Sequence, residues 1–318
     1  MESQLHGTVL ITGATGFIGS HLCRRLANNQ RVALHAISRS EQEGSKGIRW
    51  WKADLAASTA VRSVFAEVKP DFVFHLASVV TGARDISFVR PTLEANFLST
   101  VNIMIGAAES GCRRVVLAGS MEEPAGAADP VPCSPYAAAK FASTAYARMF
   151  HALYSLPVVV LRVFMTYGPA QKDLRKLIPY VILSLLRGEA PQTSTGTRLV
   201  DWIYVEDVVD GILRAATAPG VEGKVADIGS GTLVPIRAIV EKLVQLVCPE
   251  IVPHFGEVPD RPLEQVRVAD VAQSFQEIGW RPAVSLDEGL RRTVEWYRIH
   301  STSSQVSHQL TTAQTDGK

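Results

Sequence analysis

A tyrosine and a lysine four residues apart, Tyr136 and Lys140, have a spacing that favours proton transfer. Residues i and i+4 lie on one face of a helix, so the phenol and the ammonium would be neighbours. Free tyrosine has a pKa of about 10 and is a poor acid or base at neutral pH. A nearby ammonium favours the phenolate and lowers that pKa, so Tyr136 is predicted to be an acid/base. Ser134-Pro135 directly before it is typical of a helix start.

A serine, Ser120, stands at the end of the apolar run 114–118, which is predicted to be a strand. Open α/β sheets bind ligands at the carboxyl ends of their strands. A hydroxyl at that edge can hydrogen-bond a substrate carbonyl or alkoxide. The alternative interpretation is that Ser120 ends the strand or caps the next segment.

Three glycines, Gly13, Gly16 and Gly19, follow the apolar run 8–12 and precede a helical pattern. Gly13 permits a tight turn, Gly16 lets backbone N–H groups approach phosphates, and Gly19 lets the helix pack against the strand. The helix N-terminus adds unpaired donors and a positive dipole end. The sequence therefore predicts a site for a dinucleotide pyrophosphate in this turn. Its predicted cofactor-binding residues also include Thr15, Phe17 and Ile18.

The end of the second predicted strand carries Ser38 and Arg39, and Glu41 comes later. An acidic residue at this point usually bonds the ribose 2′-hydroxyl of NAD. A hydroxyl and a guanidinium suit a 2′-phosphate instead, so NADP is favoured over NAD. Arg39 stacked on the adenine would serve either cofactor.

The composition is that of a soluble globular protein, with 318 residues, 47% hydrophobic, 20% charged and a net charge of +1. This charge gives no reason to expect nucleic acid as a partner. No apolar run approaches the roughly 20 residues of a membrane helix, and no signal peptide is visible. The four cysteines are scattered, which predicts reduced thiols, no metal site and a cytoplasmic location.

Short apolar runs alternate with helical patterns through the first half of the chain, which predicts a parallel sheet covered by helices on both faces. The predicted domains are 1–167 plus 202–230 for the dinucleotide and 168–201 plus 231–300 for a smaller lobe. Residues 301–318 are rich in Ser, Thr and Gln and predict a disordered tail. The predicted strands are 8–12, 32–38, 48–54, 72–77, 114–118 and 158–163, and the predicted helices include 58–68, 92–110 and 136–154.

Taken together, these motifs resemble the extended short-chain dehydrogenase/reductase family, in particular its nucleotide-sugar epimerases, dehydratases and reductases. The resemblance runs from about residue 8 to 300. It implies an α/β fold, a Rossmann doubly wound parallel sheet with a smaller C-terminal α/β substrate lobe. Beyond the glycine turn and the Tyr/Lys pair it rests on Asp54-Leu55, His75-Leu76-Ala77, Asn96, Arg162, Tyr167-Gly168-Pro169, Tyr204 to Val208, Asp227 to Gly231, Arg261-Pro262 and Gly279 to Pro282.

The resemblance also implies roles for individual residues. Lys140 would bond the nicotinamide ribose and assist Tyr136, and Ser120 would hold the reacting oxygen. Asp54 and Leu55 would lie at the adenine, while Leu76, Ala77 and Val163 would line the cofactor site. The implied substrate-binding residues are Met121, Thr166, Arg198 and Arg261, the last on a substrate diphosphate.

The reaction is left open by these residues. Glu122 stands two residues after Ser120, the offset at which dehydratases of the superfamily place a proton-removing Glu, and it could equally bind a sugar hydroxyl. Pro124-Ala125 replaces an expected Tyr-Gly, so either Ser120 or Met121 occupies the catalytic position. Val200-Asp201-Trp202 lacks a diphosphate-binding arginine, although Arg198 is near.

The leading hypothesis is an NAD(P)-dependent epimerase, dehydratase or reductase that acts on a nucleotide sugar through a 4-keto intermediate. The alternatives are an NADPH-dependent reductase of a non-sugar carbonyl compound and a non-catalytic dinucleotide-sensing protein. The resemblance further implies a homodimer, with which the apolar residues in 92–110 and 141–153 are compatible.

Overall fold

The computed structural model describes residues 5–42, 47–124, 131–260 and 265–301. These residues form two compact units, each with its own sheet and core. The first unit takes its described residues from Met1–Phe164, Glu206–Gly229 and Ala269–Arg281. The second takes them from Met165–Val205, Ser230–Val268 and Pro282–Lys318.

The first unit is built on a parallel seven-stranded sheet with the order β10-β6-β5-β4-β1-β2-β3. Central strands of such a sheet are covered on both faces, which requires continuous apolar runs. All four residues of β4 are accordingly buried. The strands are β1 (Gly7–Thr12), β2 (Val32–Ser38), β3 (Ile48–Lys52), β4 (Phe72–His75), β5 (Arg114–Ser120), β6 (Val158–Val163) and β10 (Val225–Ile228).

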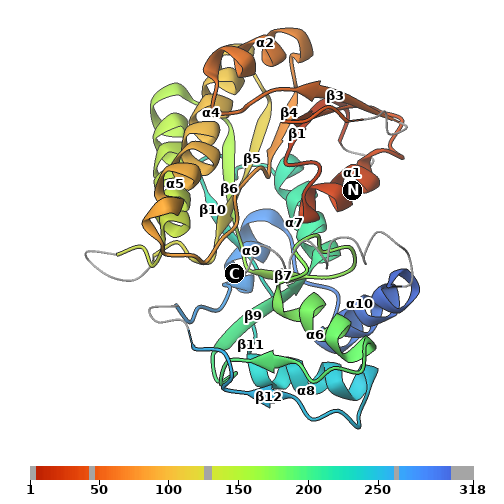
Figure 1. Ribbon diagram of the computed structural model, residues 1–318. Coiled ribbons are helices and arrows are strands. Elements are labelled where there is room, and N and C mark those ends of the chain that lie inside the picture. The colour runs from red at the N-terminus through yellow and green to blue at the C-terminus, as the bar shows by residue number, and fades with distance from the viewer. Residues whose placement is uncertain (1–4, 43–46, 125–130, 261–264, 302–318) are drawn as a thin grey trace. The chain divides into compact units, whose positions relative to one another are not determined.

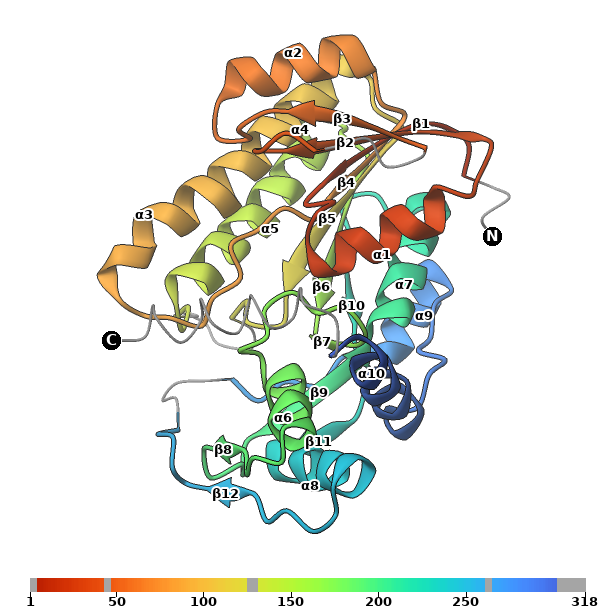
Figure 2. The ribbon, with the colours of Figure 1, turned by 45° about the vertical axis from the view of Figure 1, so that its right-hand side comes forward.

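Helices cover both faces of this sheet (Figure 1). One face carries α2 (Ser58–Val68), α4 (Ser99–Ser110) and α5 (Pro135–Tyr154), whose apolar side chains share a buried cluster with those of β1, β4, β5 and β6. The other face carries α1 (Phe17–Leu26), α7 (Val205–Thr217) and α9 (Val271–Ile278), with α9 beside α7 in Figure 2. The predicted Rossmann-type α/β sheet is thereby confirmed.

The predicted helix 92–110 is divided in the structure. A short 3-10 turn η1 (Ile86–Phe88) and α3 (Val89–Thr92) lead into a π-helical segment, η2 (Leu93–Leu98), before α4 begins. The hydroxyls of Ser99 and Thr100 donate to carbonyls four residues earlier, a bond that perturbs regular helix geometry. The sequence pattern predicted a helix over these residues. It did not predict the π-helical segment between α3 and α4.

The second unit has a three-stranded sheet in the order β11-β9-β7, with a two-stranded pair β12-β8. Its helices bury an apolar core that includes Ile182, Leu243 and Val294. The elements are β7 (Met165–Tyr167), α6 (Leu177–Leu186), β8 (Gln192–Thr193), β9 (Leu199–Tyr204), β11 (Leu233–Pro235), α8 (Ile236–Val247), β12 (His254–Phe255) and α10 (Leu286–His300). Within the described ranges, no helix combines the length and apolar character needed to cross a membrane.

The unit boundaries differ from the predicted domains 1–167 plus 202–230 and 168–201 plus 231–300 in three places. Residues 202–205, predicted to lie in the dinucleotide domain, belong to the second unit. Strand β7 joins the second unit because it pairs with β9 there. Residues 269–281, predicted to lie in the lobe, join the first unit instead. They are held there by the Ser274 hydroxyl, which donates to the Asp227 carbonyl, and by the Trp280 indole N–H, which donates to the Asp207 carbonyl. Of the tail 301–318, only Ser301 is described.

Candidate active site

The order of the sheet places β1 beside β4, although α1, β2, β3 and α2 separate them in sequence. The chain reverses its direction of strand addition at this point. Their last residues, Thr12 and His75, are register partners. Ligands of such sheets bind outside the carboxyl ends of the strands at this reversal. The glycine turn that follows Thr12 therefore lies at the expected ligand site.

The first and third glycines of the turn have no room for a side chain. Gly13 has φ +70°, and a Cβ there would lie 2.6 Å from the backbone nitrogen of Ala77. A Cβ on Gly19 would lie 2.1 Å from the Gly13 carbonyl oxygen. These contacts bring the start of α1 directly against the turn, as predicted from the sequence.

The N-terminus of α1 fits an anionic group. Its N-cap, Gly16, contributes no side-chain hydrogen bond, and the first turn of the helix contains no acidic residue. A Cβ on Gly16 would lie 3.1 Å from the Gly13 oxygen, a tight contact. Thr15 is exposed, and Phe17 and Ile18 are half-buried beside these helix N–H groups. A dinucleotide pyrophosphate suits such a cradle because the free N–H groups and the helix dipole favour negative charge.

A buried hydrogen-bond chain fixes the end of β4 next to this turn. The Thr100 hydroxyl donates to the Asn96 carbonyl at 2.5 Å, so it accepts from His75 Nε2 at 3.0 Å. Nδ1 of His75 then accepts from the Thr12 hydroxyl at 2.7 Å, and Thr12 Oγ1 accepts from the Ala77 N–H at 3.2 Å. Burial first, and the charge of Lys140 second, lower the pKa of His75 to about 3, so its ring is neutral.

The predicted cofactor-lining residues Leu76 and Ala77 are half-buried next to Gly13. The segment that follows is held by Asn96, whose side-chain oxygen accepts from the Val79 N–H at 2.7 Å and whose side-chain amide donates to the Val79 carbonyl at 3.0 Å. Sequence reasoning matched Asn96 to the family pattern without assigning it this function.

The residues predicted at the adenosine end lie at the ends of β2 and β3. Ser38 ends β2, and its hydroxyl accepts from the Ser40 N–H, while Arg39 is exposed. The Asp54 carboxylate accepts from the Ala56 N–H and shapes the turn before α2. Leu55 instead sends its side chain into the core, where it is 9% exposed.

The predicted catalytic residues Ser120, Tyr136 and Lys140 come together at the carboxyl end of β5. Ser134 caps α5 by accepting from the Ala137 N–H at 3.1 Å, which fixes where the helix begins. The Ser120 side chain lies close enough to the Tyr136 phenol to lower its pKa. Nζ of Lys140 donates to the Ala118 carbonyl at 2.7 Å and lies 6.0 Å from the centroid of the Tyr136 ring.

Val163, the last residue of β6, is the register partner of Ser120 and accepts from the Met121 N–H at 3.2 Å. Met121 is buried, with 4% exposed.

The pKa of Tyr136 differs from the sequence-based expectation. The spacing predicted that Lys140 would lower it, whereas in the structure burial raises the Tyr136 pKa well above its ordinary value of 10. The hydrogen bond with Ser120 lowers it, and the negative charges of Glu122 and Glu123 raise it further. Burial is the largest of these effects, because desolvation disfavours the phenolate.

Two consecutive carboxylates follow Ser120 in different environments. Glu122 is half-buried, and its backbone N–H donates to the Ser120 hydroxyl at 3.1 Å. Glu123 is only 2% exposed and bonds Ser120 and Thr144. Sequence reasoning selected Glu122 and missed Glu123. The signal in the sequence was the glycine at position 119, because a Cβ there would occupy the space of the Glu123 carboxylate.

The remaining predicted substrate residues belong to the second unit. Thr166 is on β7 as the register partner of Ile203, and the Arg198 carbonyl accepts from the Ile236 N–H. Asp201 is fully buried and accepts from the backbone N–H groups of Ser230 and Gly231. Arg261 lies outside the described residues.

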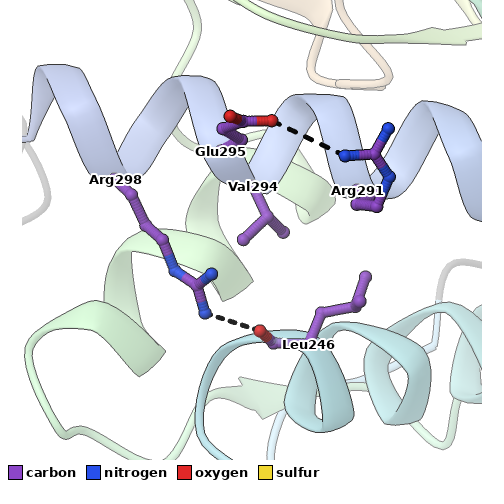
Figure 3. A pocket seen from close by; sticks show the side chains of 5 residues that line it. All are labelled: Leu246, Arg291, Val294, Glu295 and Arg298. Atoms are coloured by element: carbon purple, nitrogen blue, oxygen red, sulfur yellow. Dashed lines mark hydrogen bonds and ion pairs between the residues drawn. The ribbon is translucent and has the colours of Figure 1, made fainter.

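A groove of about 280 Å³ on the second unit is lined by none of the predicted residues (Figure 3). Arg298 on its wall donates to the Leu246 carbonyl at 2.6 Å, and Arg291 lies 3.7 Å from Glu295. Because these charged groups have partners on α8 and α10, the groove is not the candidate active site. Its lining residues are Leu246, Arg291, Val294, Glu295 and Arg298.

Known proteins resemble this chain in sequence over most of its length. The dTDP-glucose 4,6-dehydratase of Haemophilus influenzae is 28% identical, over 93% of this chain and 99% of that protein. The UDP-glucose 4-epimerase of Mycolicibacterium smegmatis is 31% identical, over 92% of this chain and 99% of that protein.

Solved structures share the fold. MoeE5 in complex with UDP-glucose and NAD is 31% identical with a TM-score of 0.82, covering 93% of this chain and 100% of that one. The UDP-glucose 4-epimerase of Thermotoga maritima, with UDP-glucose, has a TM-score of 0.84 at 24% identity, covering 92% and 99%. The sequence model of the NAD dependent epimerase/dehydratase family matches residues 9–229. Together with the glycine turn and the parallel sheet, this match shows that the chain belongs to the NAD dependent epimerase/dehydratase family.

Proposed function

We propose that this enzyme moves a hydride between carbon 4 of a nucleotide-activated hexose and a bound NAD(P), through a 4-keto sugar. The observation that carries the proposal is the gathering of Ser120, Tyr136 and Lys140 at the carboxyl end of β5. The glycine turn ends β1 of the same sheet. Relatives named for dTDP-glucose and UDP-glucose support the sugar nucleotide as substrate class.

Each residue of the site has a defined part in this reaction. A nicotinamide bound at this site would supply the hydride acceptor for the alcohol carbon and the hydride donor for the ketone. Tyr136 as phenolate takes the hydroxyl proton during oxidation, and as phenol it gives that proton to the keto oxygen during reduction. Ser120 donates a hydrogen bond to the same oxygen, and the Lys140 ammonium stabilises the phenolate.

Three net reactions share this first step. Return of the hydride to the other face of the keto sugar gives epimerisation. Removal of the carbon 5 proton by Glu122, loss of the carbon 6 hydroxyl as water, and return of the hydride to carbon 6 and of a proton to carbon 5 would give a 4-keto-6-deoxy sugar and oxidised cofactor, which is dehydration. Entry of a ketone and exchange of the cofactor at each turnover give reduction.

The test begins with the cofactor that the purified protein retains, released by denaturation and identified by mass spectrometry. The protein is then incubated with UDP-glucose and with dTDP-glucose, and products are identified by NMR. Retained oxidised cofactor with a 4-epimer or a 4-keto-6-deoxy product is the expected result. No product from either sugar, with turnover of an aromatic ketone and NADPH, would favour the non-sugar reductase.

That second candidate is favoured by one observation in the second unit. Val200-Asp201-Trp202 lacks the expected arginine, and Asp201 is occupied with Ser230 and Gly231. This part of β9 therefore serves the unit's own structure.

The acid/base role of Tyr136 is tested by Tyr136→Phe. Loss of general acid-base catalysis is expected to lower kcat by about 10²- to 10⁴-fold. Tyr154→Phe, on the exposed end of the same helix, is the matched control and should retain wild-type kcat. Unchanged behaviour of Tyr136→Phe would instead support a dinucleotide-sensing protein without turnover.

We also propose that the cofactor is NADP rather than NAD, supported by Ser38 at the end of β2 and the exposed Arg39 beside it. Arg39→Ala is expected to weaken NADPH binding about tenfold or more, because a guanidinium pairs with a phosphate, and to leave NADH binding nearly unchanged. Fluorescence titration with both cofactors decides this. Equal losses for the two cofactors would show that Arg39 only stacks on the adenine.

A homodimer is the proposed assembly. Apolar side chains of α3, η2 and α5 are exposed in the described chain, among them Leu93 (50%) and Tyr146 (41%). The Phe97 and Tyr146 rings form an edge-to-face pair that links η2 to α5. Exposed apolar side chains on neighbouring elements support an interface between protein chains.

A further inference from the structure

Glu123, a carboxylate that the proposed reaction does not use, links two parts of the active site. Its Oε1 accepts from the Ser120 N–H at 2.7 Å, and its Oε2 accepts from the Thr144 hydroxyl at 2.8 Å. Thr144 lies one helical turn beyond Lys140 on α5. The side chain therefore joins the turn that carries Ser120 to the helix that carries Tyr136 and Lys140.

The sequence around Glu123 leaves space for this arrangement. A Cβ at Gly119 would lie 2.6 Å from Glu123 Oε1, so any larger residue at position 119 would displace the carboxylate. The Glu123 N–H also donates to the Ser120 carbonyl at 3.2 Å, which closes a tight turn after β5. The absence of a side chain at Gly119, the turn at Ser120 and the hydroxyl of Thr144 together fix the position of the carboxylate.

A buried carboxylate is costly unless charges and donors compensate it. Burial raises the pKa of Glu123, while its bonds with Ser120 and Thr144 and the charges of Arg162 and Lys140 lower it. Glu123 and Lys140 attract each other, so each charge also shifts the pKa of the other group. Burial lowers the pKa of Lys140 to about 8, and the negative charge of Glu123 raises it. Glu123 therefore favours the charged form of Lys140.

The other ionisable groups around Lys140 do not replace this effect. His75 on β4 is neutral because burial lowers its pKa to about 3. Tyr136, on the same helix as Lys140, has a pKa that burial raises, so burial disfavours a negative charge on this phenol. Arg162 on β6 lies 2.9 Å from an Asp227 oxygen on β10, so each of these charges has an opposite charge beside it. In the described part of the chain, Glu123 is the acid whose charge favours the Lys140 ammonium.

We propose that Glu123 is a positioning residue that orients Ser120 and keeps Lys140 charged, and so acts on the reaction through these two side chains. The catalytic part of this inference rests on the proposed function. The coupling between Glu123 and Lys140 does not, and it can be measured without any substrate.

The experiment compares wild type with Glu123→Gln, using protein labelled with ¹³C at the lysine ε-carbons. The Lys140 signal is assigned by its absence in Lys140→Met, and its chemical shift is followed against pH. Loss of the carboxylate charge is expected to lower the Lys140 pKa by about one unit. It is also expected to lower kcat by about tenfold or more with little change in KM, and to move the alkaline limb of kcat to lower pH.

Thr144→Val is the matched control, because it removes one hydrogen bond and keeps the carboxylate. It should leave the Lys140 pKa near the wild-type value and lower kcat less than Glu123→Gln does. If Glu123→Gln does not fold, Glu123→Asp takes its place. The shorter acid should retain the Lys140 pKa and still lower kcat, since its oxygens cannot reach both partners.

An unchanged Lys140 pKa and an unchanged kcat in folded Glu123→Gln would overturn the proposal, as would wild-type kcat in Glu123→Asp. Wild-type protein that turns over no nucleotide sugar would overturn the proposed function. The Lys140 titration would then still decide whether Glu123 keeps this lysine charged.

Discussion

Burial sets the protonation of the individual residues at the carboxyl edge of the sheet. Lys140 is 4% exposed and Tyr136 7% exposed, and desolvation moves their pKa values in opposite directions. Each group is thereby biased toward its neutral form, the phenol for Tyr136 and the amine for Lys140. The hydrogen bond from Ser120 and the charge of Glu123 counter this bias at the two groups respectively.

The same desolvation makes the unfolding free energy depend on pH through His75. In the folded state its pKa is lowered from 6.5 to about 3, so the unfolded chain binds a proton first as the pH falls. The stabilisation is therefore present above pH 6.5 and is lost as the pH falls toward 3. From pH 7 to pH 5 this one group should cost about 2 kcal/mol of unfolding free energy.

His75→Leu tests this dependence by urea unfolding at pH 7 and pH 5. At pH 7 the variant should be about 2–3 kcal/mol less stable than wild type, because Thr12 and Thr100 lose buried partners. At pH 5 the difference should narrow by about 2 kcal/mol. A difference that is equal at both pH values would contradict the neutral, buried state of His75.

At the scale of elements, the turn between β1 and α1 combines a close backbone approach with an open helix N-terminus. Gly13 touches the segment after β4, and Gly19 touches Gly13. Gly16 provides the N-cap without a side-chain bond. Packing and ligand binding are thus assigned to different glycines.

Alanine substitutions should separate these two tasks. Gly19→Ala is expected to destabilise the fold by about 3 kcal/mol or more, because its Cβ would meet the Gly13 oxygen at 2.1 Å. Gly16→Ala has a milder contact of 3.1 Å, so it should fold and lose about tenfold or more in cofactor affinity. Thermal unfolding and cofactor titration measure the two effects.

Gly188→Ala is the control for these variants. Its φ is +77° and nothing lies within 4 Å of the added Cβ, so only the backbone is strained. It should cost about 1–2 kcal/mol and leave cofactor affinity unchanged. Equal affinity in Gly16→Ala and wild type would show that this turn does not contact the cofactor.

At the scale of the whole molecule, the proposed homodimer is tested on the exposed apolar face of η2 and α5. Tyr146→Glu is expected to shift the protein to a monomer, because burying an unpaired carboxylate in an interface is unfavourable. Light scattering coupled to size-exclusion chromatography measures the mass. Val252→Glu, at a residue 75% exposed in the second unit, is the control. A monomeric wild type would exclude the homodimer. A dimeric Tyr146→Glu would place the contact on another surface.

Local patterns predicted much of this protein. The glycine spacing after an apolar strand, and the four-residue spacing of Tyr136 and Lys140, depend on backbone geometry within a few residues. The alternation of strands and helices predicted the parallel sheet for the same reason. These features need no knowledge of distant contacts, which is why the sequence by itself determined them.

The tertiary structure alone decided which groups are buried together. It placed the Glu123 carboxylate on the Thr144 hydroxyl and near enough to Lys140 to raise that lysine's pKa. It also moved 269–281 into the first unit and raised the Tyr136 pKa that its spacing from Lys140 was expected to lower. Each of these outcomes depends on desolvation or on contacts between residues far apart in the chain. Neither can be read from local spacing, because both arise only when strands and helices pack.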